Sequence, residues 1–450
     1  MSGGSHNDMV SKMQRDFYRL FDESVRALHA SEHLTASFHG EMSDFVRINR
    51  AQIRQAGHVH QRNLTLRLIH NQRQTSVAFT LTGELYVDAK RAQEHIAQMR
   101  ADVSLLPPDP HLLVNESDQS LVDVALSALP SSESALELVL DAAIGSDLVG
   151  IWASGPICIG FASTWGQRSF HARQAFNLDF SLYTGGDKAV KSDYAGMKFD
   201  EQRLRERIAS AQSQLPALQR PPHVLKPGEY RAWVSPAALA EVVGLISWDS
   251  FGVKSQKTRR SGLQRVVDGA ASLSHLVTWA EDVQGGVAPR FGTSGFRRPN
   301  RVNLIDKGAF AASLVSPRSA REYDLATTGP AESPDSLWMA PGTLDDADAL
   351  SALGTGVYVG NLWYTNWSDL PAGRLTGMTR FATFWVEDGR IVAPLSVMRF
   401  DDTIERLFGT ELEALGSRSE LQLSNSTYGS RSTASVRLPA ALLKSFRLTL

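Results

Sequence analysis

The chain has 450 residues, of which 42% are hydrophobic and 21% are charged, so it can bury sizeable cores and is expected to form two domains. A formal net charge of -2, with both signs mixed along the sequence, argues against a protein that binds nucleic acids or membrane surfaces through a basic patch. No apolar run approaches the roughly 20 residues needed to cross a bilayer, and the polar start at residues 1–10 is unlike a signal peptide.

The first part of the sequence predicts helices packed on an antiparallel sheet. Apolar residues recur at helical spacing between Met13 and Leu28, over a charged opposite face. Alternating apolar and polar residues then predict strands, and a second helix follows them; the strands are expected at residues 45–48, 64–68 and 77–81, and the helix at 88–103. Strands that alternate in this way belong to an antiparallel sheet with one face in water.

A similar cycle of elements follows in the sequence. It comprises a helix over residues 133–144, strands over 148–161, 176–182 and 191–196, and a helix over 201–215. The order of helix, strands and helix therefore occurs twice, although no motif recurs residue for residue. The single cysteine, Cys158, lies in an apolar strand and reads as a small buried hydrophobe. Because it cannot form a disulfide within the chain, we expect a cytoplasmic protein.

The proline-containing segment 216–222 marks the expected boundary between a domain at residues 1–219 and a domain at residues 220–450. Beyond it, a strand at 229–234 leads to Ser235 and Pro236, which are typical of a helix N-cap and first helical position. The further expected elements are an apolar helix at 237–246, an exposed loop at 255–261, a helical segment at 262–276, a hairpin near 302–308, a long surface loop at 327–341, a short helix at 347–353, a β meander at 356–400 and a strand at 432–438.

Three segments of the second domain resemble a known family. They are the helical segment Ala240-Glu241-Val242-Val243-Gly244-Leu245, the string at 291–308, and residues 356–389, GVYVGNLWYTNWSDLPAGRLTGMTRFATFWVEDG. Together they resemble the TldD/TldE family, in which TldE is also called PmbA, and the likeness spans nearly the whole chain. The resemblance implies an α+β fold of two domains, an N-terminal α/β domain with helices on a largely antiparallel sheet and a C-terminal antiparallel β-rich domain.

The resemblance also implies which ligands of a metal site are missing. In TldD-type zinc peptidases the helix reads HExxxH, and here Ala240 and Leu245 stand at the histidine positions while Glu241 matches the glutamate. The family cysteine near the C terminus falls near Thr427 or Tyr428, where this chain has none. Because a catalytic zinc needs three protein ligands with nitrogen, sulfur or oxygen donors, we expect no metal or other cofactor here and an inactive Glu241. The zinc is expected in a partner subunit.

Other side chains admit more than one interpretation. The pairs His29 with His33 and His58 with His60 are more typical of solvated faces than of metal sites, because neither forms a full ligand set in the sequence. The aromatic cluster beyond residue 360 indicates either packing at a sheet edge or the wall of a peptide groove or subunit interface. The candidate peptide or interface contacts are Asn361, Trp363, Tyr364, Trp367 and Arg380.

Three functions therefore stay open at this point. The resemblance implies a TldE-like, non-catalytic subunit that joins a TldD-like peptidase to degrade unfolded peptides or to trim the leader of a modified precursor. The main alternative is a stand-alone homodimer that binds peptides or regulates another protein, because the sequence does not show the partner. An active metallopeptidase with a displaced site is the third. The expected partners are a TldD-like subunit or a second copy of the chain, together with a peptide, and neither nucleic acid nor membrane.

Overall fold

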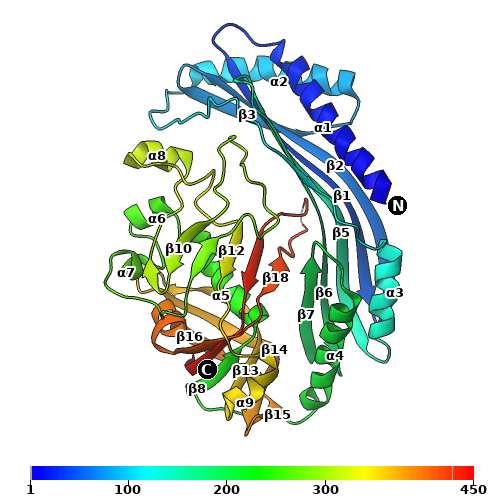
Figure 1. Ribbon diagram of the computed structural model, residues 1–450, viewed down its shortest axis with the longest axis vertical. Helices are drawn as coiled ribbons and strands as arrows, with labels where there is room; N and C mark the ends of the chain where they lie inside the picture. Colours follow the sequence, from blue (N-terminus) through cyan, green and yellow to red (C-terminus); the bar gives the residue numbers. More distant parts are fainter. Residues whose placement is uncertain (1–2, 428) are drawn as a thin grey trace.

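The computed structural model describes residues 3–427 and 429–450, and its N-terminal half forms one long curved sheet with helices on its outer side (Figure 1). The elements of this half are α1 (Gly3–Val25), β1 (His33–Asn49), β2 (Gln52–His70), β3 (Arg73–Thr80), α2 (Leu85–Leu105), β4 (Val122–Ala125), α3 (Ser132–Ala142), β5 (Asp147–Ser163), β6 (Arg168–Tyr183), β7 (Ala189–Gly196) and α4 (Glu201–Leu218). The strand order is β3-β2-β1-β5-β6-β4, with β7 also paired to β6. Only the short β4 runs parallel to its neighbour among these pairs.

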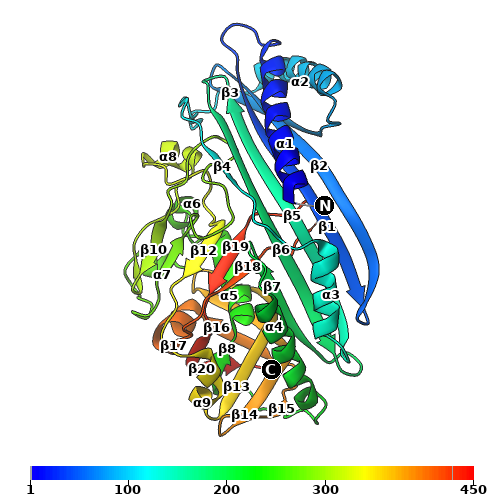
Figure 2. The ribbon, with the colours of Figure 1, turned by 45° about the vertical axis from the view of Figure 1, so that its right-hand side comes forward.

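Two apolar cores hold the helices against the convex face of this sheet. The first joins α1 and α2 to the sheet, with Phe17 stacked on Phe38 at a ring distance of 5.3 Å. The second joins α3 and α4 to the sheet, with Trp152 stacked on Phe176, also at 5.3 Å. The strands of the two sequence cycles thus lie side by side in one sheet, and the two pairs of helices cover its two ends (Figure 2). The opposite, concave face turns toward the rest of the chain.

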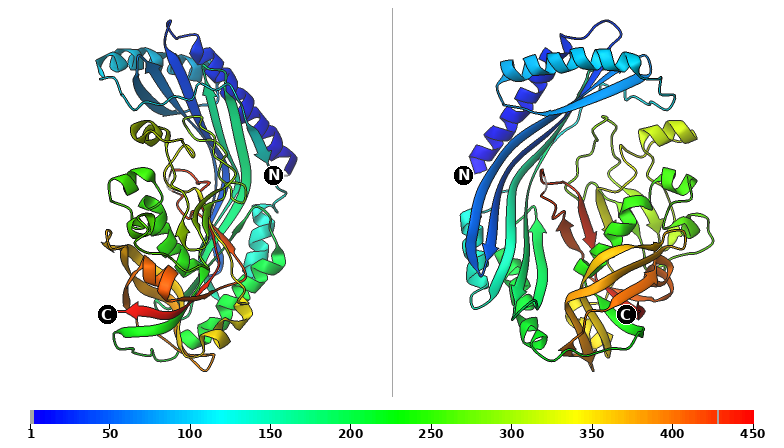
Figure 3. Two further views of the ribbon diagram at one scale, coloured as in Figure 1. Left: turned by 60° about the vertical axis from the view of Figure 1, so that its left-hand side comes forward. Right: turned by 180° about the vertical axis from the view of Figure 1, so that it is seen from behind.

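The C-terminal half contains two further sheets, which lie on the concave side of the first (Figure 3). Its elements are β8 (Gly228–Val234), α5 (Pro236–Asp249), α6 (Val253–Lys257), α7 (Gln264–Val267), β9 (Trp279–Glu281), β10 (Val302–Asp306), β11 (Ala309–Phe310), α8 (Pro317–Tyr323), β12 (Ser336–Met339), α9 (Ala349–Leu353), β13 (Gly356–Asp369), β14 (Arg374–Glu387), β15 (Arg390–Pro394), β16 (Arg399–Thr403), β17 (Leu412–Leu415), β18 (Glu420–Leu423), β19 (Ser435–Leu438) and β20 (Ala441–Leu448). The fold is therefore α+β, with a β-rich C-terminal region, as expected from the sequence.

Five strands of the third sheet pair in a closed ring. Its order is β13-β8-β20-β16-β14-β15, and β13 also pairs with β14, while the second sheet has the order β11-β10-β9-β12-β19-β18. The helix α5 packs on this body through Ala238, Leu239, Val242, Val243 and Ile246, all of them buried. Its start is as expected, because the Ser235 side chain accepts a hydrogen bond of 3.2 Å from the Ala238 amide and Pro236 occupies the first turn.

Several sequence-based expectations for the C-terminal half were wrong. The expected surface loop at 327–341 contains β12, whose Leu337 and Met339 are buried between β9 and β19; the prolines and serines around this short strand obscure it. The expected helical segment at 262–276 holds only α7 among its described residues, and Gly269, two residues beyond the end of α7, adopts a left-handed conformation with φ +71° that stops the helix. The basic loop at 255–261 begins inside α6.

The predicted domain boundary falls in the connection between α4 and β8. The helix α4 continues through Pro216 to Leu218, so the break in structure begins slightly later than the prolines indicated. A division at residues 219 and 220 stays a prediction, since the second core also includes Ala382 and Phe384 from β14. Across the described residues, no helix is both long and apolar enough to cross a membrane.

Candidate functional site

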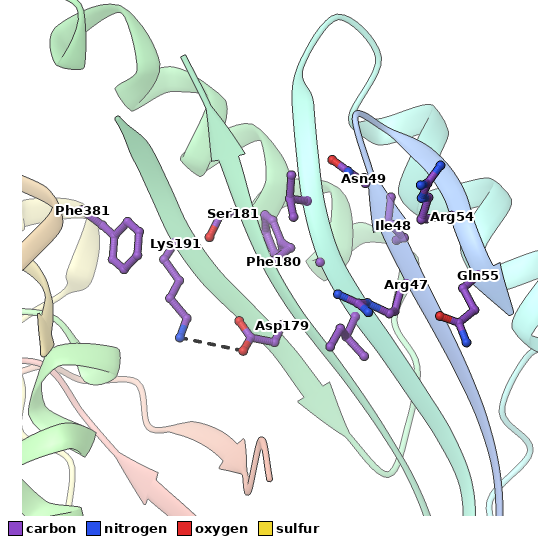
Figure 4. Close-up of a pocket in the computed structure, with 13 residues that line it drawn as sticks. Arg47, Ile48, Asn49, Arg54, Gln55, Asp179, Phe180, Ser181, Lys191 and Phe381 are labelled. Atoms are coloured by element: carbon purple, nitrogen blue, oxygen red, sulfur yellow. Dashed lines mark ion pairs between the residues drawn. The ribbon is translucent and has the colours of Figure 1, made fainter. Parts of the chain in front are cut away.

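A cavity of about 730 Å³ lies between the concave face of the first sheet and the body of the C-terminal half (Figure 4). We call it the central cavity. Its lining residues are Arg47, Ile48, Asn49, Arg54, Gln55, Val149, Gly150, Ile151, Asp179, Phe180, Ser181, Lys191 and Phe381. All but Phe381 come from strands of the first sheet, and Phe381 faces them from β14.

The alternation of β6 explains why one wall of the cavity is polar. Phe176, Leu178, Phe180 and Leu182 are buried in the core beneath α3 and α4. The intervening residues must then point to the other face, because successive strand side chains alternate. Asp179 and Ser181 therefore reach the central cavity. The expectation of an antiparallel sheet with one polar face is confirmed here. This polar face lies opposite the C-terminal half and is only partly exposed to solvent.

An ion pair spans two strands on this wall. The Lys191 Nζ atom lies 3.8 Å from Asp179 Oδ2, and both side chains are half-buried (Figure 4). Burial raises the pKa of Asp179 above its usual value, while the charge of Lys191 acts in the opposite direction. Farther along β7, burial raises the pKa of Asp193 to about 7, against the attraction of Arg207. Asp179, Asp193 and Lys191 therefore form a group of partly buried charges that only partly neutralise one another.

The family glutamate position, Glu241, lies on α5 with its side chain exposed at the helix surface. Partial desolvation raises the pKa of Glu241, the charge of Lys191 lowers it and the charge of Asp179 raises it, so the three groups interact electrostatically. The β13 residue Thr365 donates a 3.4 Å hydrogen bond to the Glu241 carbonyl oxygen and ties β13 to the helix. Glu241 thus lies near the central cavity with no metal ligand beside it on the helix.

The positions expected to have lost their ligands are occupied by apolar side chains in the structure. Ala240 and Leu245 are half-buried and pack against the main C-terminal core. Neither side chain has a donor atom for a metal. Among the described residues, no group of three or more His, Cys, Asp or Glu side chains is placed to hold a metal ion. The side chains present on α5 therefore do not fit a zinc site of the HExxxH type.

The candidate aromatic contacts separate into two groups. The ring centres of Trp363 and Tyr364 lie 4.3 Å apart, and the two residues are 43% and 68% exposed. The Arg380 guanidinium lies 3.7 Å from the Trp363 ring centre. We call Trp363, Tyr364, Arg380 and Phe381 the aromatic rim, since Arg380 also lies 4.8 Å from the ring centre of Phe381. By contrast, Asn361 is buried, and Trp367 packs into the core against Gly262.

The backbone of the aromatic rim is unusual. Tyr364 and Phe381 both adopt a left-handed conformation with φ +53°, which non-glycine residues seldom do. The pairing of β13 with β14 also shifts register near these positions, between Val359 and Asn361 and between Trp363 and Asn366. Such backbone conformations are concentrated at functional sites. Phe381 lines the central cavity, and Arg380 connects it to the exposed rings of Trp363 and Tyr364.

The segment between β18 and β19 crosses the concave face and is fixed there by Arg431. This guanidinium is 6% exposed and donates hydrogen bonds to Ser43 Oγ, Gly155 O and Ala175 O at 3.2, 3.1 and 2.9 Å. The Arg431 amide donates to Glu41 at 3.0 Å. Thr427, the other position considered for a family ligand, belongs to this segment, whereas Tyr428 lies outside the described residues.

The remaining candidate residues are engaged in structure. Cys158 is fully buried, and burial raises the pKa of its thiol to about 12, which is unfavourable for a nucleophile. His58 Nδ1 lies 2.8 Å from Asp44 Oδ1 on the convex face, and His33 stacks on Trp165 at 4.4 Å. The structure therefore brings neither histidine pair to the central cavity.

A family comparison agrees with this architecture. Residues 227–449 match the model of the PmbA/TldA metallopeptidase C-terminal domain, and the whole chain has the fold of a solved family member. The chain belongs to the TldD/PmbA family. No curated protein matches its sequence significantly.

Solved structures extend the likeness over the N-terminal half of this TldD/PmbA family member. TldE from Thermococcus kodakarensis is similar with a TM-score of 0.78 and 13% identity, covering 97% of this chain and 100% of that one. A protein of Thermotoga maritima, described as a candidate modulator of a DNA gyrase, gives 0.74 and 11%, with coverages of 97% and 100%. A Bacteroides thetaiotaomicron protein with a similar description gives 0.70 and 15%, with coverages of 96% and 97%. At these identities the likeness shows the fold alone.

The sequence patterns missed the charged side chains on the face of the first sheet that lines the central cavity. We call this face the floor of the central cavity. Arg47 was visible only as the polar residue inside a predicted strand, and Asp179 and Lys191 as polar neighbours of apolar positions. The signal that was available is the wet face itself, since Asp179 had to lie opposite the core-facing residues. Which polar residues become neighbours depends on strand register, which the sequence did not provide.

Proposed function

We propose that the chain is a TldE-like, non-catalytic subunit of a TldD/TldE-type zinc metallopeptidase that degrades unfolded peptides or trims the leaders of modified precursors. The observation that carries the proposal is the donor set of α5, where Ala240 and Leu245 pack against the core and Glu241 stands without a ligand beside it. A carboxylate without a metal-bound water has nothing to activate in this chemistry. The zinc would accordingly belong to the partner.

The open cavity and its aromatic rim support a role in holding peptide or partner. Exposed tryptophan, tyrosine and arginine side chains are enriched at binding surfaces, and the aromatic rim gathers all three types. The single buried Cys158 is consistent with a place in the cytoplasm, which we include in the proposal.

We expect the chain to form a one-to-one complex with a TldD-like protein through its C-terminal half. Co-expression followed by size-exclusion chromatography with light scattering measures this. The double variant Trp363→Ala with Tyr364→Ala should weaken the complex by roughly tenfold or more, as for aromatic residues central to an interface. The control Tyr86→Ala removes an 83% exposed tyrosine from α2 and should have no effect. A chain that elutes alone beside the TldD-like protein, as monomer or homodimer, contradicts the proposal.

A further inference from the structure

Rows of side chains cross the floor of the central cavity at right angles to the strands. Cross-strand partners place Gln55, Arg47, Ile151, Asp179 and Asp193 in one row, and Val149, Ser181 and Lys191 in the next. The floor thus reaches from β2 to β7 across five adjacent strands. At a strand spacing of about 4.8 Å it is roughly 19 Å wide, the length of about six residues of extended peptide.

The end of this floor formed by β1 and β2 is positively charged. Arg47 and Arg54 are both exposed at the β1 and β2 end, and neither side chain makes an ion pair or hydrogen bond within residues 3–427 and 429–450. At the other end, Lys191 lies 3.8 Å from Asp179, and the cross-strand partner of Asp179 on β7 is Asp193. The positive charge without a counter-charge is therefore concentrated at Arg47 and Arg54. Neighbouring cations in a cleft attract a ligand group of the opposite sign.

Apolar groups lie between and across from these charges. Ile151, which is 39% exposed, is the cross-strand partner of both Arg47 and Asp179. Phe381 faces the floor from β14 (Figure 4), and the guanidinium of its neighbour Arg380 lies over the rings of Trp363 and Phe381. A ligand crossing the floor thus meets guanidinium groups first, an apolar patch next, and then the Asp179 and Lys191 pair.

We propose that the central cavity selects extended peptides in which acidic side chains contact Arg47 and Arg54 and a neighbouring apolar side chain covers Ile151 and Phe381. This inference rests on the proposed function, because it names the class of peptide that the subunit would present. Guanidinium groups without an internal partner keep their charge available for a carboxylate of the ligand. The width of the floor and the apolar patch beside the cations favour a peptide over a small inorganic anion, which would use the cations alone.

Binding of fluorescent hexapeptides to the full-length chain, followed by anisotropy, tests the selection. Three peptides of one sequence differ only at two adjacent positions, which carry Glu, Gln or Lys beside a leucine. We expect the Glu peptide to bind roughly tenfold more tightly than the Gln peptide, the Lys peptide to bind most weakly, and the preference to shrink as salt is raised. In the double variant Arg47→Ala with Arg54→Ala the preference should fall to about twofold or less.

Matched controls separate this inference from general electrostatics and from the proposed function. Arg203→Ala removes an exposed arginine from α4, outside the central cavity, and should leave the preference unchanged. Equal binding of the three peptides, or a preference that persists in the double variant, overturns the charge selection while complex formation with a TldD-like protein still tests the function separately. If millimolar phosphate displaced the labelled Glu peptide as readily as unlabelled Glu peptide does, the floor would be a simple anion site. That result would also overturn the proposed peptide selection.

Discussion

Replacing Arg431 with alanine is expected to lower the free energy of unfolding by about 3 kcal/mol, because three buried hydrogen bonds are lost together. The Arg431 side chain joins the segment between β18 and β19 to acceptors on β1, β5 and β6. Burial lowers its pKa to about 10, so the group stays charged near neutral pH. Alanine would leave Gly155 O and Ala175 O without this donor on the concave face.

Urea denaturation measures the effect, and two further variants show its origin. Arg431→Lys keeps the charge but not the planar fork of donors, so it should recover less than half of the loss. Arg418→Ala, an exposed arginine just before β18, should change stability by less than about 0.5 kcal/mol. A loss below about 1 kcal/mol for Arg431→Ala would mean that the segment is held mainly by other contacts.

Replacing Asp193 with asparagine is expected to stabilise the chain by about 2 kcal/mol at pH 8. Burial raises the pKa of Asp193 to about 7 in the folded chain, compared with about 4 for an unfolded aspartate. Folding therefore favours the protonated form. The stability contributed by this group is fully present below about pH 4 and is lost as the pH rises through 7. The full linkage value is larger, but an amide in the same place still pays for its own desolvation.

The difference in unfolding free energy between wild type and Asp193→Asn, measured from pH 4 to pH 8, isolates this titration. The difference should be small at pH 4, grow up to about pH 7 and level off by pH 8. Both proteins should keep some pH dependence in this range, since burial also raises the pKa of Glu281 to about 7. Asp187→Asn, at an exposed hairpin residue, serves as the control. A gain that does not change with pH would show that Asp193 is not desolvated in the folded chain.

The sequence predicted elements with strong periodicity and missed short strands and cross-strand neighbours. The alternation around Phe176 predicted a strand with one buried face. The sequence did not predict that three other aromatic rings lie 4.9 to 5.4 Å from the Phe176 ring on this face. The strand β12 has only four residues between prolines, so its propensity signal was lost in its surroundings. Its burial comes from pairing with β9 and β19, which are distant in sequence.

The candidate site was predictable in part for the same physical reason. Trp363 and Tyr364 stood out as aromatic residues in a polar segment, and the structure places them together at the aromatic rim. Trp367, four residues beyond Trp363, packs into the core because the bulges in β13 shift its register. Arg47 and Lys191 are 144 positions apart in the printed sequence, and only the order of strands in the first sheet places both on one floor. Local patterns carry no such information.

Hydrolysis of an unfolded peptide by purified components tests the proposed non-catalytic role most directly. Three samples are compared: this chain alone, a TldD-like protein alone, and the two together, each with zinc supplied. The account predicts no cleavage by this chain alone and cleavage by the mixture well above that of either component, unchanged when Glu241 is replaced by glutamine and abolished when the HExxxH glutamate of the TldD-like protein is replaced. Cleavage by this chain alone that is lost in Glu241→Gln would contradict the account.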